Sequence, residues 1–311
     1  MQVNEERLES VPLCDFCERS DFRLWFDAGH IKIVRCQHCG LMFLTPRLRK
    51  EALRDLYNRH EYYQDVSPAS SKLIHVPFYV EMLNRIKTSA KASGSLRLLE
   101  VGAGGGLLSK CAALMGYDVT AQEISRPGIE RLRAWGIKVI DGDFEELTDL
   151  GCGFDAVIAL HLIEHMQSVR VFLDKVYRCL NSRGVLILQV PNFGSADFKF
   201  NSEIFSKMLS LPYHNFFFTP KTLGRYLKAV KFRITSVEYN LPFWIRGLST
   251  LFREQGIGRD PGQDPAAFED VICRTVAHQR PGSLGREARQ FLRQGIARIV
   301  PGDCMTIYAQ K

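Results

Sequence analysis

The chain has 311 residues, of which 46% are hydrophobic, and this is enough for one large α/β domain with a small appendage. Its formal net charge of +7 at pH 7 allows a partner that carries phosphate or carboxylate but does not require one. The first residues, MQVNEERLES, are too polar for a secretory signal, and the longest apolar runs fall far short of the ~20 residues of a membrane helix. We therefore expect a cytoplasmic protein that does not span a membrane.

Four cysteines near the N-terminus have the spacing Cys-x2-Cys-x18-Cys-x2-Cys. Each Cys-x-x-Cys turn brings two thiolates close enough to share one cation, and two turns complete a tetrahedron with no open position. This pattern predicts a structural zinc ion bound by Cys14, Cys17, Cys36 and Cys39. His38 lies inside the second turn, but four thiolates already close the site, so we expect no ligand role for it.

Between the two cysteine pairs, FRLWFDAGHIKIVR alternates apolar and polar residues around Gly29, as in a β-hairpin. We therefore expect residues 1–46 to form a zinc ribbon, whose folding energy would come from the metal. The remaining cysteines stand singly among apolar neighbours, and we expect them to be reduced core residues. They are Cys111, Cys152, Cys179, Cys273 and Cys304.

A run of glycines follows an apolar stretch in LRLLEVGAGGGLLSKCAALMG. The apolar residues 96–101 predict a strand, the glycines a tight loop, and the residues up to Gly116 a helix, which together open a nucleotide-binding doubly wound fold. A dinucleotide fingerprint would place its third glycine one position later, at Leu107, and dinucleotide folds usually have an apolar residue where this chain has Glu100. Both departures weaken the interpretation as an NAD-dependent oxidoreductase.

Strands and helices continue to alternate after this loop. The strand YDVTAQE ends at Glu123, about 20 residues after the first strand, where an acidic partner of a ribose is expected. The strands IKVI, FDAVIAL and GVLILQVPN follow, and the helix VFLDKVYRCL precedes the last of them. The pattern predicts an α/β fold with a doubly wound, mostly parallel sheet. Its carboxyl edge, where open α/β sheets bind ligands, would bring together Gly102, Glu123, Asp143 and His161.

On these motifs the chain resembles the class I S-adenosylmethionine-dependent methyltransferases. LLEVGAGGG is similar to their first motif, FDAVIALHLIEHM to their fourth, and GDCMTIYAQK to their closing antiparallel strand. The resemblance covers residues 96–240 and 301–311, and it implies a seven-stranded Rossmann-like sheet with S-adenosylmethionine as the cofactor. It also implies that Glu123 holds the ribose hydroxyls and that Asp143 and Phe144, in GDF, contact the adenine. The implied cofactor-binding residues are Glu100, Gly102, Gly104, Gly106, Glu123, Asp143, Phe144 and His161.

The stretch HLIEH, residues 161–165, also matches an inverted zinc-protease motif, which needs a long exposed helix. Here it follows directly on a predicted buried strand, so we do not expect a protease. The resemblance implies that residues after this strand face the methyl group. An imidazole can remove a proton from an acceptor near neutral pH. We therefore expect His165 to be the catalytic base with Glu164 as its partner. His214 is the rival for the same task, and a purely structural role for His165 is the other alternative.

Two further segments, residues 46–95 and 194–300, lie outside the minimal sheet. We expect residues 47–95 to form a helical linker and cap. The methyltransferase domain would occupy residues 96–311 and contain a helical lid at about 241–300. Tyr63 and His214 are candidates to orient the acceptor from these segments, because each lies in an aromatic stretch that could cover the strand ends.

The stretch PYHNFFFTPKTLGRYL carries two more local signals. Phe216 to Phe218 are expected to pack in the core rather than to contact a ligand. Thr219 followed by Pro220 predicts a helix that begins with an N-cap threonine and a first-turn proline.

The stretches IVRCQHCGLMFLTPR, YNRHEYYQD and YHNFFFTPKTL resemble a group of bacterial methyltransferases that act on sugars and related small molecules in antibiotic or surface-polysaccharide pathways. That resemblance implies a small acceptor, a sugar or a nucleotide-linked sugar, and leaves open whether oxygen, nitrogen or carbon is methylated. An RNA methyltransferase is one alternative, but the acidic residues of the ribbon argue against nucleic acid. A non-catalytic zinc-ribbon interaction protein is the other.

Overall fold

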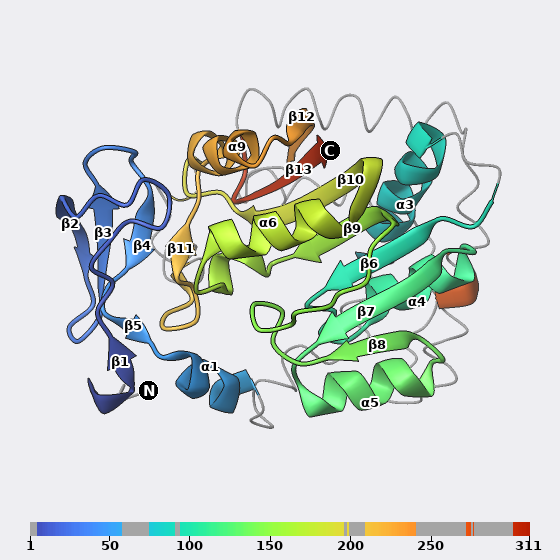
Figure 1. Cartoon of the computed structure of the whole chain (residues 1–311), viewed down its shortest axis with the longest axis horizontal. Coiled ribbons are helices and arrows are strands. Elements are labelled where there is room, and N and C mark those ends of the chain that lie inside the picture. The colour runs from blue at the N-terminus through green and yellow to red at the C-terminus, as the bar shows by residue number, and fades with distance from the viewer. Residues whose placement is uncertain are drawn as a thin grey trace, which may run out of the picture.

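The computed structural model describes residues 5–57, 75–90, 94–195, 198, 209–240, 272–274, 276 and 301–311. Within them, a seven-stranded sheet flanked by helices forms the larger part, and a four-stranded sheet stands beside it (Figure 1). Tyr63 and nearly all of the predicted lid at 241–300 lie outside the described residues.

The seven-stranded sheet confirms the predicted doubly wound, mostly parallel α/β fold. The strands in spatial order are β12 (Arg233–Tyr239), β13 (Cys304–Gln310), β10 (Leu180–Pro191), β9 (Phe154–Leu160), β6 (Arg97–Val101), β7 (Asp118–Glu123) and β8 (Lys138–Asp141). Neighbouring strands from β8 across to β10 are parallel, and β13 is antiparallel to both of its neighbours, as the closing GDCMTIYAQK predicts.

Helices cover both faces of this sheet (Figure 1). Side chains alternate across a strand, so in β6 Leu99 and Val101 join the core under α6 and α9, while Leu98 joins the core under α3 and α4. The central strand β9 is apolar at nearly every position because both of its faces are covered. The helices are α3 (Val76–Ala90), α4 (Leu107–Leu114), α5 (Arg126–Ala134), α6 (Val169–Cys179) and α9 (Pro220–Ala229).

The four-stranded sheet contains the predicted hairpin and one strand from far along the chain. Strands β2 (Phe22–Asp27) and β3 (Lys32–Cys36) form the hairpin, with Gly29 in the turn at a φ of 84°. Strand β4 (Met42–Leu44) follows, and β11 (Phe216–Phe217) pairs with its outer edge. We call residues 5–46 the ribbon. Its sheet is therefore completed by residues that the sequence had assigned to the methyltransferase domain.

Short elements connect the ribbon to the larger sheet. Strand β1 (Leu8–Glu9), which follows a 3-10 turn, pairs with β5 (Arg47–Leu48), and helix α1 (Lys50–Tyr57) comes next. Helix α9 begins as predicted, with Thr219 as N-cap in a reciprocal capping box with Thr222. The predicted core packing of Phe216 to Phe218 is also confirmed, since each side chain is at most 2% exposed.

The prediction that all five single cysteines are buried is only partly correct. Cys111 and Cys179 are buried, but Cys273 and Cys304 are half-buried and Cys152 is exposed. Cys152 lies between Gly151 and Gly153, both at positive φ, in the loop that leads into β9, and this places it outside the core. Among the described residues, no helix is long and apolar enough to cross a membrane.

Candidate active site

The glycines at 102–106, which we call the glycine loop, have distinct roles. Gly102 and Gly106 both have positive φ, and a Cβ atom at either would collide with a leucine side chain, Leu162 at 2.6 Å or Leu132 at 2.8 Å. Gly104 also has positive φ, but a Cβ there would meet no atom within 4 Å. Gly102 and Gly106 are thus required for packing and backbone shape, while Gly104 faces open space where a ligand could approach the backbone.

Glu123, at the end of β7, holds the glycine loop in shape. Its Oε2 accepts a hydrogen bond from Gly104 N at 2.5 Å, and its Oε1 accepts from Ile124 N at 3.0 Å and Ser125 N at 2.8 Å. The residue is 5% exposed. A carboxylate has about four acceptor positions, so these three bonds leave room for about one more. The ribose contact stays a prediction, and the loop-holding role is one that the sequence motif did not indicate.

Glu100, at the end of β6, is buried beneath the loop rather than beside open space. Its carboxylate accepts a hydrogen bond from the Ser109 hydroxyl of α4. Burial raises the pKa of Glu100 to about 8, and the nearby Glu123 carboxylate acts in the same direction, while the Ser109 bond opposes both. A direct cofactor contact by Glu100 stays a prediction. The described structure assigns it a packing and hydrogen-bonding role with α4.

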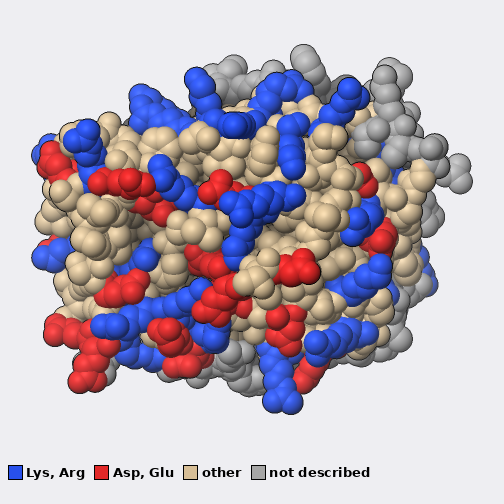
Figure 2. Space-filling view, viewed as in Figure 1, with Lys and Arg blue, Asp and Glu red and all other residues tan. Residues whose placement is uncertain are grey.

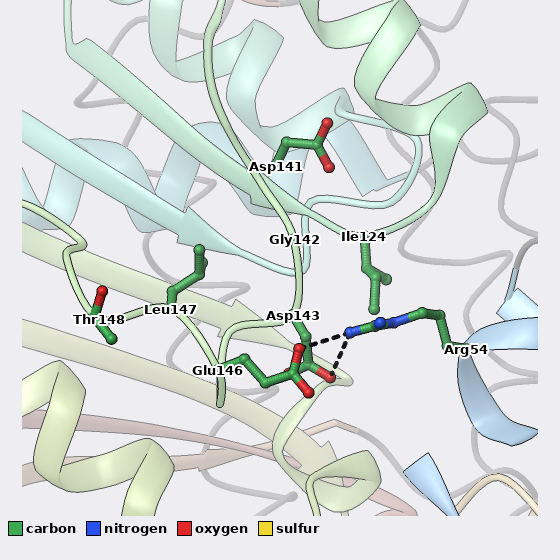
Figure 3. Close-up of a pocket in the computed structure, with 8 residues that line it drawn as sticks. All are labelled: Arg54, Ile124, Asp141, Gly142, Asp143, Glu146, Leu147 and Thr148. Carbon is green, nitrogen blue, oxygen red and sulfur yellow. Dashed lines mark hydrogen bonds and ion pairs between the residues drawn. The ribbon is translucent and has the colours of Figure 1, made fainter. Parts of the chain in front are cut away.

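Asp143 lies at the edge of a cleft that Figure 3 shows between the ends of β7 and β8 and helix α1. Its carboxylate forms ion pairs with Lys50 Nζ at 3.3 Å and Arg54 Nη2 at 3.8 Å. The Phe144 ring is 3% exposed and packs on Phe172, with 5.0 Å between ring centroids. Asp143 therefore borders a cleft, while Phe144 is buried in the core and is not among the residues that line the cleft.

Residues 161–168, which we call the histidine turn, follow β9 directly. They include the one-turn 3-10 helix η3 (Ile163–His165), which is far shorter than a zinc-protease helix. His161 has a positive φ of 51°, and its half-exposed ring lies 3.5 Å from Glu164 Oε1 and 3.6 Å from Cys304 Sγ. Gly102 packs against Leu162. The glycine loop and the histidine turn are thus in direct contact.

Glu164 is a buried carboxylate among imidazoles. It is 1% exposed, and within the described part of the chain neither oxygen accepts a hydrogen bond of normal geometry, since the 3.5 Å contact with His161 is an ion-pair distance. Burial acts to raise the pKa of Glu164, but His161, His165 and His214 outweigh burial and lower it below its ordinary value. The group is therefore an anion that needs a positive charge nearby.

His165 is held so that one ring nitrogen remains an acceptor. Its Nδ1 lies 3.0 Å from the Tyr213 carbonyl oxygen and 3.1 Å from the Tyr57 hydroxyl. A carbonyl can only accept, so Nδ1 carries the proton and Nε2 keeps its lone pair. Burial lowers the pKa of His165, although Glu164 opposes this, and the ring is therefore neutral near pH 7.

His214 joins this group from the segment before β11. Its ring is 7% exposed and its centroid is 4.7 Å from that of His165. One donor atom from each of Glu164, His165 and His214 lies within 4.8 Å of the others. Such a cluster can pass or share a proton, and its donor atoms are also of the kind that holds a divalent cation.

The four predicted zinc ligands come together in the ribbon. The Sγ atoms of Cys14 and Cys39 are 3.4 Å apart, those of Cys17 and Cys36 are 3.5 Å apart, and all four lie within 4.8 Å of one another. Burial raises the pKa of Cys39 to about 11, so a bound cation is needed to keep it as a thiolate. This closed four-sulfur set fits a structural zinc ion, with no position for substrate.

Sequence reasoning missed several residues around the histidine turn. Tyr57 contacts His165, Asn215 bonds the backbone of the turn, and Asp15 bonds Ser168. Each lies in a stretch that the sequence analysis singled out, namely the first Cys-x-x-Cys turn, YNRHEYYQD and YHNFFFTPKTL, but no pattern in those stretches indicated these contacts. Each residue reaches the turn from a segment more than 45 residues away in the chain.

Comparison with known proteins shows the family of the chain. A family model described as a methyltransferase domain matches residues 52–237. A ubiquinone biosynthesis O-methyltransferase from Azorhizobium caulinodans is 36% identical over 103 residues, which are 31% of this chain and 41% of that protein. Another from Rickettsia prowazekii is 26% identical over 156 residues, 48% of this chain and 59% of that protein. The chain thus spans about half the length of the curated relatives it matches.

Among solved structures, a protein from Thermotoga maritima is similar in fold. It is described as a SAM-dependent methyltransferase and possible histamine N-methyltransferase, and it is 18% identical with a TM-score of 0.50, covering 83% of this chain and 99% of that one. At this identity the likeness concerns the fold alone. The matched family model nevertheless covers more than half of the chain, and the chain therefore belongs to the methyltransferase domain family.

Proposed function

We propose that the protein transfers a methyl group from S-adenosylmethionine to a small acceptor, and that His165 removes the acceptor's proton. One observation carries this proposal most directly. Gly102 of the glycine loop packs against Leu162 of the histidine turn, so the expected donor site and a buried acid–base cluster adjoin each other. A methyltransferase needs this proximity because donor, acceptor and base must meet at one point.

The donor half of the site consists of the loop and strand ends from β6 to β8. Gly104 offers an open approach to the backbone, Glu123 has about one acceptor position left for a ribose hydroxyl, and Asp143 borders the cleft where the adenine would lie. The residues fit the nucleoside part of the cofactor. When bound, S-adenosylmethionine supplies an activated methyl group on a positively charged sulfur.

The acceptor half is the Glu164, His165 and His214 cluster. The neutral His165 ring can accept the acceptor's proton at Nε2, and the Glu164 carboxylate stabilises the imidazolium that results. The Tyr213 carbonyl keeps the ring in one orientation by holding Nδ1–H. His214 is the alternative base, because it belongs to the same cluster.

For the acceptor we propose a sugar or nucleotide-linked sugar, on the resemblance of the ribbon and cap stretches. Methylation of a hydroxyl in a ubiquinone precursor is a second candidate, favoured by the names of the curated relatives. An RNA acceptor has less support. Figure 2 shows acidic side chains interspersed with basic ones across the middle and lower parts of the face in view, and mainly basic ones along its upper edge. A surface that binds the phosphate backbone would be basic more continuously.

A transfer assay tests the proposal. Purified protein with methyl-labelled S-adenosylmethionine would be offered nucleotide-linked sugars, hydroxylated aromatic compounds and ribosomal RNA in separate reactions. We expect label in a small-molecule product, at a rate that does not fall steeply with salt. Label in RNA, with a steep loss at higher salt, would establish the RNA alternative instead. Binding of S-adenosylhomocysteine measured alongside separates a missing acceptor from a protein that does not use the cofactor.

A further inference from the structure

We propose that the ribbon positions the histidine turn, with Asp15 and Asn215 as the positioning residues, so that zinc loading holds the acceptor half of the site in place. The inference rests on the proposed function only in treating the histidine turn as the acceptor half. Three independent sets of hydrogen bonds run from the ribbon and its adjoining strands to residues 164–169.

The first set comes from Asp15, which lies between the first two predicted zinc ligands. Its Oδ1 accepts a hydrogen bond from Ser168 Oγ at 2.6 Å, and its Oδ2 accepts from Val169 N at 3.2 Å and from the Tyr226 hydroxyl at 2.8 Å. Ser168 is itself the N-cap of α6, and a carboxylate is stabilised at the N-terminus of a helix. One ribbon side chain thus fixes the end of the histidine turn and the start of α6.

The second set comes from Asn215, which links the ribbon sheet to the backbone of the turn. Its backbone carbonyl accepts from Leu44 N of β4 at 2.9 Å, and its backbone N donates to the Glu164 carbonyl at 2.8 Å. Its side-chain Nδ2 donates to the carbonyls of His165 and Met166, each at 3.1 Å. The peptide groups around His165 are therefore attached to the edge of the ribbon sheet.

The third set comes from β5, which follows the ribbon directly. Arg47 Nη1 donates to the Gln167 carbonyl at 2.7 Å, and the Gln167 side chain donates to the Leu48 carbonyl at 3.4 Å. Glu145, which belongs to neither the ribbon nor β5, accepts from the backbone N of Gln167 and of Ser168, at 2.9 and 2.7 Å. The turn is therefore bonded by Asp15 of the ribbon, by Asn215 and β5, which adjoin the ribbon sheet, and by Glu145.

The glycine loop is held differently, by residues of its own sheet. Gly102 N and Ala103 N donate to the Gln122 carbonyl, and the Gln122 side chain donates to the Gly142 carbonyl at 2.5 Å. Glu123 supplies the bond to Gly104. Loosening the ribbon should therefore disturb the acceptor half of the site and leave the donor half intact.

A cation shared by the two cysteine turns would join these contacts into one unit. Asp15 follows Cys14 directly, and β4, which carries Leu44, begins shortly after Cys39. The Cys39 carbonyl also accepts a hydrogen bond from Arg225 of α9. A zinc ion that held the four sulfurs together would keep the Asn215 contacts at residues 164–166 and the Asp15 contacts at residues 168 and 169 at a fixed spacing.

Hydrogen exchange on the zinc-loaded, full-length protein, with and without S-adenosylhomocysteine, tests the proposal. In Asp15→Asn, the Val169 amide, which donates to Asp15 directly, and the neighbouring amides of residues 165–168 should exchange about tenfold faster, because the bonds that hold the end of the turn to a charged group are weakened. The amides of residues 102–106, the zinc content and the affinity for S-adenosylhomocysteine should not change. Asp21→Asn is the matched control, since it removes the same charge from an exposed ribbon side chain and should alter none of these values.

Ser168→Ala removes the partner of the same bond from outside the ribbon, together with the N-cap bond to Val171 N. If Asp15→Asn loses zinc or folds poorly, exchange at residues 165–168 in Ser168→Ala, rather than within α6, decides the question. Normal exchange at residues 165–168 in Ser168→Ala and in any folded, zinc-bound Asp15→Asn would overturn the proposal. So would equal loosening of residues 102–106, because the effect would then be global. A wild-type protein that does not bind S-adenosylhomocysteine would contradict the proposed function instead, and the exchange comparison would still stand.

Discussion

At the scale of single residues, the groups that surround His165 determine where its ring proton lies and whether the ring is charged. The Tyr213 carbonyl fixes the proton on Nδ1, and burial keeps the ring neutral. Glu164 lies next to it as a buried anion that can stabilise the ring once it takes up a proton. The sequence placed Glu164 and His165 at a strand end, but the ring's orientation follows from a cap residue almost 50 positions away, which no local pattern predicts.

Replacing His165 tests its role as the base. His165→Ala should lower turnover on the acceptor found in the transfer assay by roughly 10²–10⁴-fold, the range for a positioned acid–base group. Affinity for S-adenosylhomocysteine should hardly change, and Glu164→Gln should lower turnover less. His30→Ala, on an exposed ribbon side chain, is the control. A larger loss of turnover in His214→Ala than in His165→Ala would assign the base to His214.

Glu123→Gln tests the donor half. The amide keeps the size of the side chain but weakens its bonds to the loop and to a ribose hydroxyl, so we expect S-adenosylhomocysteine to bind about 1–3 kcal/mol more weakly in calorimetric titration. Asp118→Asn is the control, because it lies at the opposite end of the same strand and pairs with Lys138. An unchanged affinity in Glu123→Gln would mean that another residue holds the ribose.

The raised pKa of Glu100 predicts that the stability of the protein depends on pH. Its pKa is about 8 in the folded protein and near 4.5 when unfolded, so between these values the unfolded state binds fewer protons and stability falls as pH rises. The contribution is about 1.4 kcal/mol per pH unit within that window. Urea unfolding of Glu100→Gln should therefore show a flatter loss of stability between pH 6 and 8, unlike the exposed Glu130→Gln control. Equal slopes in wild type and Glu100→Gln would contradict the buried, protonated state.

At the scale of secondary-structure elements, the sequence was most informative where a signal is local. The hairpin around Gly29, the strand–loop–helix of the glycine loop and the capped start of α9 each depend on neighbouring residues, and each is found where it was predicted. Strand β11 could not be predicted, because it has two residues and exists only by pairing with β4, more than 170 positions earlier. The join between ribbon and methyltransferase domain was missed for that reason.

The ribbon itself predicts a clear response to loss of metal. Wild-type protein should contain one zinc ion per chain by plasma mass spectrometry, and Cys36→Ser should lose it and destabilise the ribbon far more than the large sheet, because so small a sheet depends on the metal for its stability. Cys152→Ser, at an exposed cysteine, should keep the zinc and the stability. A folded ribbon without metal, or a disulfide between its cysteines, would contradict the zinc site.

At the scale of the whole molecule, the site joins parts of the chain that lie far apart in sequence. The sheet brings the glycine loop and the histidine turn together, as expected for the carboxyl edge of a mostly parallel sheet. The contacts of the turn with Tyr57 and Asp15 span 108 and 153 positions. Such contacts arise from the packing of the ribbon and cap on the sheet, and a single sequence carries no pattern for them. The glycine loop and the acidic residues at the strand ends could thus be located from motifs, while the contacts that hold the histidine turn could be found only in the structure.

The central claim is that the glycine loop and the histidine turn form one site, with the methyl donor on one side and His165 on the other. A crystal structure with S-adenosylhomocysteine tests this most directly. We predict the adenosine between Glu123 and Asp143, and the sulfur beside Gly104, close enough to His165 Nε2 for one acceptor atom to lie between them. A sulfur nearer to His214, or a His165 ring with both nitrogens bonded to the protein and facing away from it, would contradict the account.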